Sequence, residues 1–97
     1  MTNKELKDII SDMVGGDEDT LNQIVVLEGD EFADGFIGLS TDNAAVYSYE
    51  KLVTSLSTQN DDWEENDAIE WLEYNTLRAI PYIREGIAPI IIHEIMS

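Results

Sequence analysis

Carboxylate side chains are the groups in this sequence that could do the most chemistry, and they are densest between residues 61 and 73. The carboxylates of this stretch are Asp61, Asp62, Glu64, Glu65, Asp67, Glu70 and Glu73. Such groups can bind cations, exchange protons with a substrate or attract a positively charged partner. The residue types that accompany them decide which of these three chemistries the sequence favours.

A calcium loop is the first candidate, near position 30. Asp30, Asp34 and Gly35 match the first part of an EF-hand loop. That loop also needs an oxygen ligand at its third position and a bidentate glutamate at its twelfth. Phe32 and Thr41 stand at those positions here. We therefore predict no EF-hand, no metal site and no cofactor. Weak, nonspecific binding of divalent cations is the remaining alternative.

Catalytic motifs are missing from the sequence. His93 is the single histidine, and no Gly-x-Ser-x-Gly elbow supplies an activated serine. The Gly-x-x-x-x-Gly-Lys and Gly-x-Gly-x-x-Gly loops that hold nucleotide phosphates are absent as well. Paired carboxylates can do acid–base work, but here they are too numerous for one pair to be singled out. We predict that the protein is not an enzyme.

Acidic residues recur at every third position of one predicted helix, at Glu64, Asp67, Glu70 and Glu73. Each step rises about 4.5 Å and turns about 300°, so the carboxylates spiral around the helix. DNA carries one charge per about 1.7 Å of axis, so this helix imitates only a short stretch of backbone. Additional acids that would lengthen the track, if the fold brings them close, are Asp17–Asp19, Asp30, Glu31 and Asp34. The alternative is a solvated helix whose first-turn acids are stabilised by the helix dipole.

Aromatic residues beside these acids offer anchors for a partner. Trp63 and Trp71 are eight residues apart, or about 80° around a helix, which predicts one tryptophan in the core and one exposed. An exposed tryptophan within an acidic rim would suit a basic partner. A mixed polar and aromatic group follows, formed by Tyr74, Asn75, Arg78 and Tyr82. We interpret this group as structural residues at a helix end, with a recognition patch as the alternative.

Three helices are expected to position these residues. Their predicted spans are 1–14, 48–57 and 62–79. Thr2 and Asp62 each begin a capping box, Ser48 is an N-cap, and Pro81 ends the third helix. The apolar residues at helical spacing in the first helix are Leu6, Ile9, Ile10, Met13 and Val14. We expect all of them to face the core.

Four short segments have the composition of strands, at 23–28, 36–40, 44–47 and 88–94. Gly29–Glu31 and Thr41–Asn43 have turn chemistry, which predicts an antiparallel meander of the first three strands. Asp17–Asp19 is expected to be a loop. The order α-β-β-β-α-α-β predicts an α+β fold, with a small antiparallel sheet of three to four strands and three helices on one face.

Composition limits the partners further. The chain has 97 residues, which predicts a single domain over residues 1–97, and 21 acidic against 5 basic residues give a formal net charge of −16. An acidic surface is repelled by nucleic-acid phosphates and by anionic membranes, so we predict no direct binding to either. The absence of cysteine and of a signal-peptide pattern fits a reducing cytoplasm.

Several stretches of the sequence resemble one group of proteins. The stretches are Glu28-Gly29-Asp30-Glu31-Phe32, Gly35-Phe36-Ile37-Gly38-Leu39-Ser40, Ala45-Val46-Tyr47-Ser48-Tyr49, Glu70-Trp71-Leu72-Glu73-Tyr74-Asn75-Thr76-Leu77-Arg78-Ala79-Ile80-Pro81-Tyr82 and Ala88-Pro89-Ile90-Ile91. They resemble small acidic, mostly uncharacterised proteins of phages, prophages and mobile elements of Gram-positive bacteria. Small acidic phage proteins often inhibit host defence, so the resemblance implies an anti-CRISPR or anti-restriction context and not a mechanism.

Two functions follow as hypotheses. In the first, the protein is a DNA-mimic-like inhibitor that occupies a basic, nucleic-acid-binding surface of a host protein, for example a nuclease. Its predicted partner-binding residues are Asp61, Asp62, Trp63, Glu64, Asp67, Glu70 and Glu73. In the second, it is a small structural or regulatory protein that self-associates as a homodimer, through strand 90–92 or an aromatic face, and its acidity serves solubility.

Overall fold

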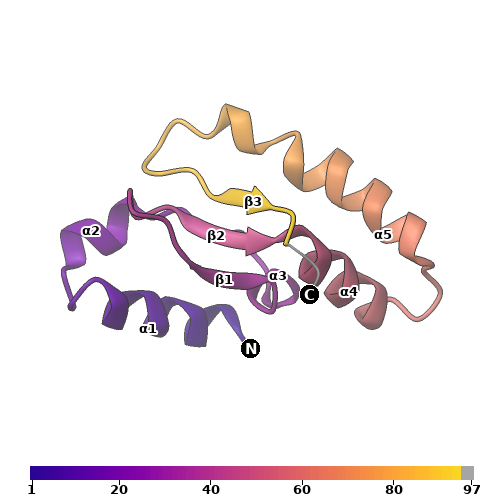
Figure 1. The fold of residues 1–97 in the computed structure, drawn as a ribbon, viewed down its shortest axis with the longest axis horizontal. Helices are drawn as coiled ribbons and strands as arrows, with labels where there is room; N and C mark the ends of the chain where they lie inside the picture. Colours follow the sequence, from indigo (N-terminus) through magenta and orange to yellow (C-terminus); the bar gives the residue numbers. More distant parts are fainter. Residues whose placement is uncertain (95–97) are drawn as a thin grey trace.

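The structure, a computed structural model, describes residues 1–94 and has an α+β fold (Figure 1). Its elements are α1 (Asn3–Met13), α2 (Glu18–Gln23), α3 (Asp30–Ala33), β1 (Phe36–Leu39), β2 (Ala45–Ser48), α4 (Tyr49–Gln59), α5 (Glu65–Leu72), the π-helix η1 (Glu73–Leu77), the 3₁₀ turn η2 (Ile80–Tyr82) and β3 (Ile90–Ile92). The predicted α+β class is confirmed. The predicted count of three helices is wrong, because α2 and α3 form where a loop and a turn were expected.

Helix α1 begins as its sequence predicts. The backbone N–H of Glu5 donates to Thr2 Oγ1 at 3.2 Å, so Thr2 is the N-cap. Leu6 and Ile10 are fully buried. Ile9 and Met13 stay 39% and 51% exposed, so only part of the predicted apolar face packs against the core. The short α1 is therefore attached to the domain along a narrow stripe.

The predicted loop and strand between residues 17 and 28 are wrong. Asp17 caps α2 by accepting the backbone N–H groups of Asp19 and Thr20, and these bonds lower the pKa of its carboxyl. Among the residues that the structure describes, the following segment pairs with the rest of the chain only through the parallel bridge Ile24↔Ile87. Leu27 is buried, and its N–H donates to the Tyr47 hydroxyl at 3.1 Å. A side chain thus replaces the strand partner that the composition implied.

A hairpin of β1 and β2 forms the first half of the sheet, as predicted. The two strands are antiparallel, with Phe36 opposite Tyr47 and Leu39 opposite Ala45. Asn43 in the predicted turn has a φ of 64°, a conformation that asparagine tolerates better than most residues. Gly35 precedes the hairpin, and a Cβ there would overlap the Leu52 side chain of α4. The absence of a side chain at Gly35 lets α4 pack closely on this end of the sheet.

The third strand pairs in the opposite sense from the prediction. β3 lies parallel to β2, with Val46 opposite Ile90 and Ser48 opposite Ile92, and the strand order is β1-β2-β3. A parallel pair needs a long crossover connection, which α4, α5, η1 and η2 provide here (Figure 1). The sheet is therefore mixed rather than antiparallel, and the acidic segment 61–73 lies on that crossover.

The core lies between one face of the sheet and the helices. Tyr47 and Leu52 are fully buried beside Leu72 of α5 and Leu6 of α1. Alternation along the strands leaves the opposite face of the sheet partly uncovered. The strand residues exposed by more than a third are Ile37, Ile90 and Ile92, and we call these three residues the outer sheet face.

Replacement of Tyr47 with phenylalanine tests the bond that holds segment 24–27. Y47F leaves the buried N–H of Leu27 without an acceptor, so we expect a loss of about 1–3 kcal/mol in unfolding free energy. Urea denaturation followed by tryptophan fluorescence measures it. Y82F, at a tyrosine that is 77% exposed, is the matched control and should have wild-type stability. Equal stability of Y47F and Y82F would contradict this role for the Tyr47 hydroxyl.

Glu50 fixes the end of β3 to α4. One carboxylate oxygen accepts the backbone N–H of Glu94 at 2.7 Å, and the other lies 2.8 Å from Nδ1 of His93. The backbone bond from Glu94, followed by the contact with His93, lowers the pKa of the Glu50 carboxyl from its usual value of 4.5. Because these contacts favour the ionised form, they stabilise the fold only while Glu50 carries its charge.

The pH dependence of this anchor has a definite sign. A carboxyl whose pKa is lower in the folded state contributes stability above its unfolded pKa and loses that contribution as the pH falls through the folded value. The wild type should therefore be more stable than E50Q at pH 7, and the difference should shrink below pH 4.5. Urea denaturation of both proteins at intervals from pH 7 to pH 3 measures the difference. A difference that is constant over this range would contradict the assignment.

Candidate partner-binding surface

The acidic segment begins in a turn and not in a helix. The N–H of Trp63 donates to the carbonyl of Asn60 at 2.8 Å. Helix α5 starts after Glu64, whose backbone N–H donates to Asp67 Oδ2 at 3.0 Å. The predicted capping box at Asp62 is therefore wrong, and Glu64 is the N-cap. A carboxylate at Asp62 or at Glu64 fits the capping-box pattern. Because the turn at Trp63 precedes the helix, Glu64 is the residue that caps it.

Three acids of this segment lie on the side of the helix that faces away from the core. Ala68 and Leu72 are fully buried. Side chains three residues apart on a helix point in directions about 60° apart. Asp67, Glu70 and Glu73 therefore occupy an arc about 120° wide on the side opposite the core, which we call the acidic arc. The sequence pattern predicts carboxylates that spiral around the helix, but α5 is too short for such a spiral. All seven predicted carboxylates of the segment are exposed, at Asp61, Asp62, Glu64, Glu65, Asp67, Glu70 and Glu73.

The two tryptophans meet beside this arc. Their ring centroids are 6.2 Å apart, and Trp71 also stacks on Phe32 at 5.9 Å with an interplanar angle of 22°. Both tryptophans are half-buried, so the prediction of one core and one exposed tryptophan is wrong. The reason is that Trp63 precedes the helix. The pair and the adjacent acids line a shallow cleft of about 450 Å³, which we call the tryptophan cleft (Trp63, Asp67, Glu70, Trp71).

Positive charge from the chain itself does not neutralise this surface. Within residues 1–94 the ion pairs are Met1–Asp34 through the terminal amino group, Lys51–Glu94 and His93–Glu50. None of them includes a carboxylate between residues 61 and 73. Arg78 follows on the same crossover, but its guanidinium lies 5.4 Å from the ring centroid of Tyr74. The acidic arc and the tryptophan cleft therefore present an uncompensated negative charge to any partner.

The polar and aromatic group after α5 is more exposed than its structural interpretation predicts. Tyr74 and Tyr82 are 70% and 77% exposed, so they do not rim the core. Asn75 Nδ2 donates to the Trp71 carbonyl at 3.1 Å, as a residue that closes a helical turn does. Arg78 lies on Tyr74 and not on a carboxylate. Tyr74 and Arg78 thus extend the exposed surface beyond the arc.

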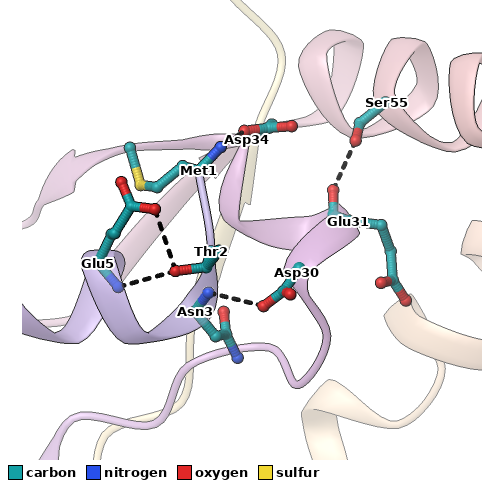
Figure 2. A network of polar contacts seen from close by, with 8 residues as sticks. All are labelled: Met1, Thr2, Asn3, Glu5, Asp30, Glu31, Asp34 and Ser55. Atoms are coloured by element: carbon teal, nitrogen blue, oxygen red, sulfur yellow. Dashed lines mark hydrogen bonds and ion pairs between the residues drawn. The ribbon is translucent and has the colours of Figure 1, made fainter.

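The other acids that could lengthen the track lie in two separate places. Asp17–Asp19 begin α2, at the opposite end of the molecule from α5 (Figure 1). Asp30 accepts the N–H of Asn3 at 2.8 Å, and Asp34 lies 2.7 Å from the terminal amino group (Figure 2). Ser55 of α4 donates to the Glu31 carbonyl at 2.7 Å in the same region. Asp30 and Asp34 thus hold the N-terminal segment in place, and α3 lies beside α5 because Phe32 stacks on Trp71. Asp17–Asp19 do not join the acids of α5.

Known proteins give no further information. Comparison of the chain with protein-family models, with curated proteins and with solved structures gave no match. Within residues 1–94 no group of three or more histidine, cysteine or carboxylate side chains is arranged to hold a metal ion. In the same part of the chain, each helix is too short or too polar to cross a membrane.

Sequence reasoning missed one group of residues that the fold brings to the surface beside Glu73. Tyr49 lies at the start of α4, yet its ring centroid is 4.5 Å from that of His93, and its hydroxyl oxygen is 3.5 Å from Glu73 Oε1. These three residues are distant in the sequence, and only the parallel pairing of β3 brings His93 to α4. No local pattern could have indicated this contact.

The acids of α5 differ in their structural role, and two alanine variants separate them. D67A removes the acceptor for the Glu64 N–H, so we expect a loss of about 1 kcal/mol in unfolding free energy. E70A makes the same change in charge without loss of a cap, and should match or exceed wild-type stability because it relieves repulsion. Urea denaturation compares them. Equal effects of the two substitutions would contradict the assignment of Asp67 as the capping partner.

Proposed function

We propose that this protein is a non-enzymatic inhibitor that occupies a basic, nucleic-acid-binding surface of a host protein. The observation that carries the proposal is the tryptophan cleft, in which two half-buried indole rings lie beside Asp67 and Glu70. The exposed acids around this cleft have no cationic partner within residues 1–94. A basic side chain of a partner would supply the missing charge.

The chemistry of the cleft suits a lysine or an arginine. An indole face attracts a cation through its ring quadrupole, and tryptophan is the most effective side chain for this contact. Asp67 and Glu70 add charge-assisted hydrogen bonds at the rim of the same cleft. The net charge of −16 would also attract a positive surface over a distance and speed encounter.

The size of the surface limits how much nucleic acid it can imitate. Helix α5 has 8 residues, which span about 12 Å. A duplex carries about seven charges over that length, at one per 1.7 Å. Helix α5 carries only three acids over that length, Glu65, Asp67 and Glu70, and Asp17–Asp19 lie at the other end of the molecule. We therefore propose contact with one basic patch, for example on a nuclease of a CRISPR or restriction system in the bacterial cytoplasm, as the resemblance to phage proteins implies.

Self-association is the second candidate, and the outer sheet face favours it. Ile37, Ile90 and Ile92 are each 38–40% exposed, and β3 is at the edge of the sheet. An edge strand with apolar side chains is a template for pairing with a second copy. The net charge of −16 on each chain opposes such pairing, so a homodimer would have to bury enough apolar area to offset the repulsion.

Affinity capture from a bacterial lysate tests both functions. The tagged wild type is compared with E64K/E70K, which reverses the N-cap acid of α5 and an acid that lines the cleft. It is also compared with D8K/D12K, which makes the same charge change on exposed positions of α1. Because Glu64 caps α5, urea denaturation first shows that E64K/E70K is folded. We expect the wild type and D8K/D12K to retain a nucleic-acid-binding protein that moderate salt or duplex DNA releases, and E64K/E70K to lose it.

Mass spectrometry of the eluates identifies the captured proteins. Equal capture by all three proteins, or loss with D8K/D12K as well, would contradict a role for the acidic arc. Retention of only the protein itself would favour the homodimer, in which case I92K should abolish self-association.

A further inference from the structure

A second cleft lies on the other side of the acidic arc, between the crossover and the edge strand. Its volume is about 380 Å³, which is within the range of small-ligand sites. The apolar part is formed by Leu77, Ile80, Pro81, Pro89 and Ile91. The polar part is formed by Tyr49, Glu73 and His93. We call this cleft the tyrosine cleft.

The polar groups of the tyrosine cleft have only part of the hydrogen bonds that they could form. The Tyr49 hydroxyl is 3.5 Å from Glu73 Oε1, longer than a good O–H···O hydrogen bond. Burial, followed by the charge of Glu73, raises the pKa of the Tyr49 hydroxyl, so it stays protonated at neutral pH. Glu73 has no cationic partner within residues 1–94. Its carboxylate therefore keeps the capacity to accept hydrogen bonds from a ligand.

The aromatic wall of the cleft is held in position by contacts outside it. The His93 ring packs against Tyr49 at a tilt of 45° with ring centroids 4.5 Å apart, and its Nδ1 lies 2.8 Å from Glu50. Glu73 begins the π-helix η1, which the N–H of Arg78 closes by donating to the Glu73 carbonyl at 3.2 Å. Segments of π-helix occur frequently at functional sites. The rim of the cleft is thus built from α4, η1 and the end of β3, and contacts among these elements hold its side chains in position.

We propose that the tyrosine cleft binds an arginine side chain of the basic partner. The inference rests on the proposed function, since it names how that partner is held. A guanidinium would pair with the Glu73 carboxylate and stack on the Tyr49 ring, while its methylene groups cover the apolar part. An anion would be repelled by Glu73, and an apolar ligand would bury the carboxylate without a hydrogen bond. Lysine lacks the planar group that both pairs and stacks.

The two clefts belong to one surface. Glu70 lines the tryptophan cleft and Glu73 lines the tyrosine cleft, and the two residues are neighbours on the exposed arc. A partner with two basic side chains at suitable spacing would reach both clefts across that arc. Contact at two clefts supplies specificity that a diffuse acidic surface lacks.

A titration of the whole protein with N-acetyl-arginine amide, followed by ¹H–¹⁵N NMR, tests the proposal. We expect saturable shifts at residues 49, 73, 77 and 93, and weaker shifts with N-acetyl-lysine amide. The neutral isostere N-acetyl-citrulline amide should give no saturable shifts there. E73Q should weaken arginine binding about tenfold, as expected for the loss of one charge-assisted hydrogen bond. E85Q, the same change at an exposed glutamate outside the cleft, should leave it unchanged.

The outcomes separate this inference from the proposed function. Shifts confined to the Trp63 and Trp71 indoles, an equal response to citrulline, or wild-type binding by E73Q would overturn the tyrosine cleft and leave the tryptophan cleft standing. Saturable binding at the tyrosine cleft, with lysate capture unaffected by E64K/E70K, would uphold the cleft and contradict the acidic arc. A spectrum of E73Q that matches the wild type shows that the variant is folded.

Discussion

Mutual repulsion among carboxylates is the constraint that the structure of this protein has to accommodate. The chain has 21 acidic residues and 5 basic ones, so most carboxylates have no cation to pair with. Several are placed where backbone N–H groups stabilise them instead, as at Asp17, Glu50 and Asp67. This placement lets the domain fold around Tyr47 and Leu52 while the remaining charge stays on the surface.

The parallel pairing of β3 with β2 determines which charges come together. It sends the chain across one face of the domain through α5, η1 and η2, and it returns His93 to the start of α4. The tryptophan cleft and the tyrosine cleft lie on either side of the same exposed arc as a result. An antiparallel β3 would not require a crossover, so the fold would not bring Glu73 close to Tyr49.

Local features of the fold could be predicted, because they depend on residues close in the sequence. Thr2 and Ser48 cap the helices that the patterns assigned to them, and the turn at Asn43 joins two adjacent strands. Long-range features could not. Leu27 is buried like a strand residue, yet the Tyr47 hydroxyl takes the place of a strand partner. The turn at Trp63 that brings the two tryptophans together likewise depends on tertiary packing.

Hydrogen–deuterium exchange of the protein with and without its captured partner tests the central claim most directly. The central claim is that the acidic arc and its two clefts are the binding surface. It predicts slower exchange on binding in residues 64–78 and unchanged exchange in α2, which begins with the acids Asp17–Asp19 at the other end of the molecule. Protection confined to β1 and β3 would place the partner on the outer sheet face and contradict the claim.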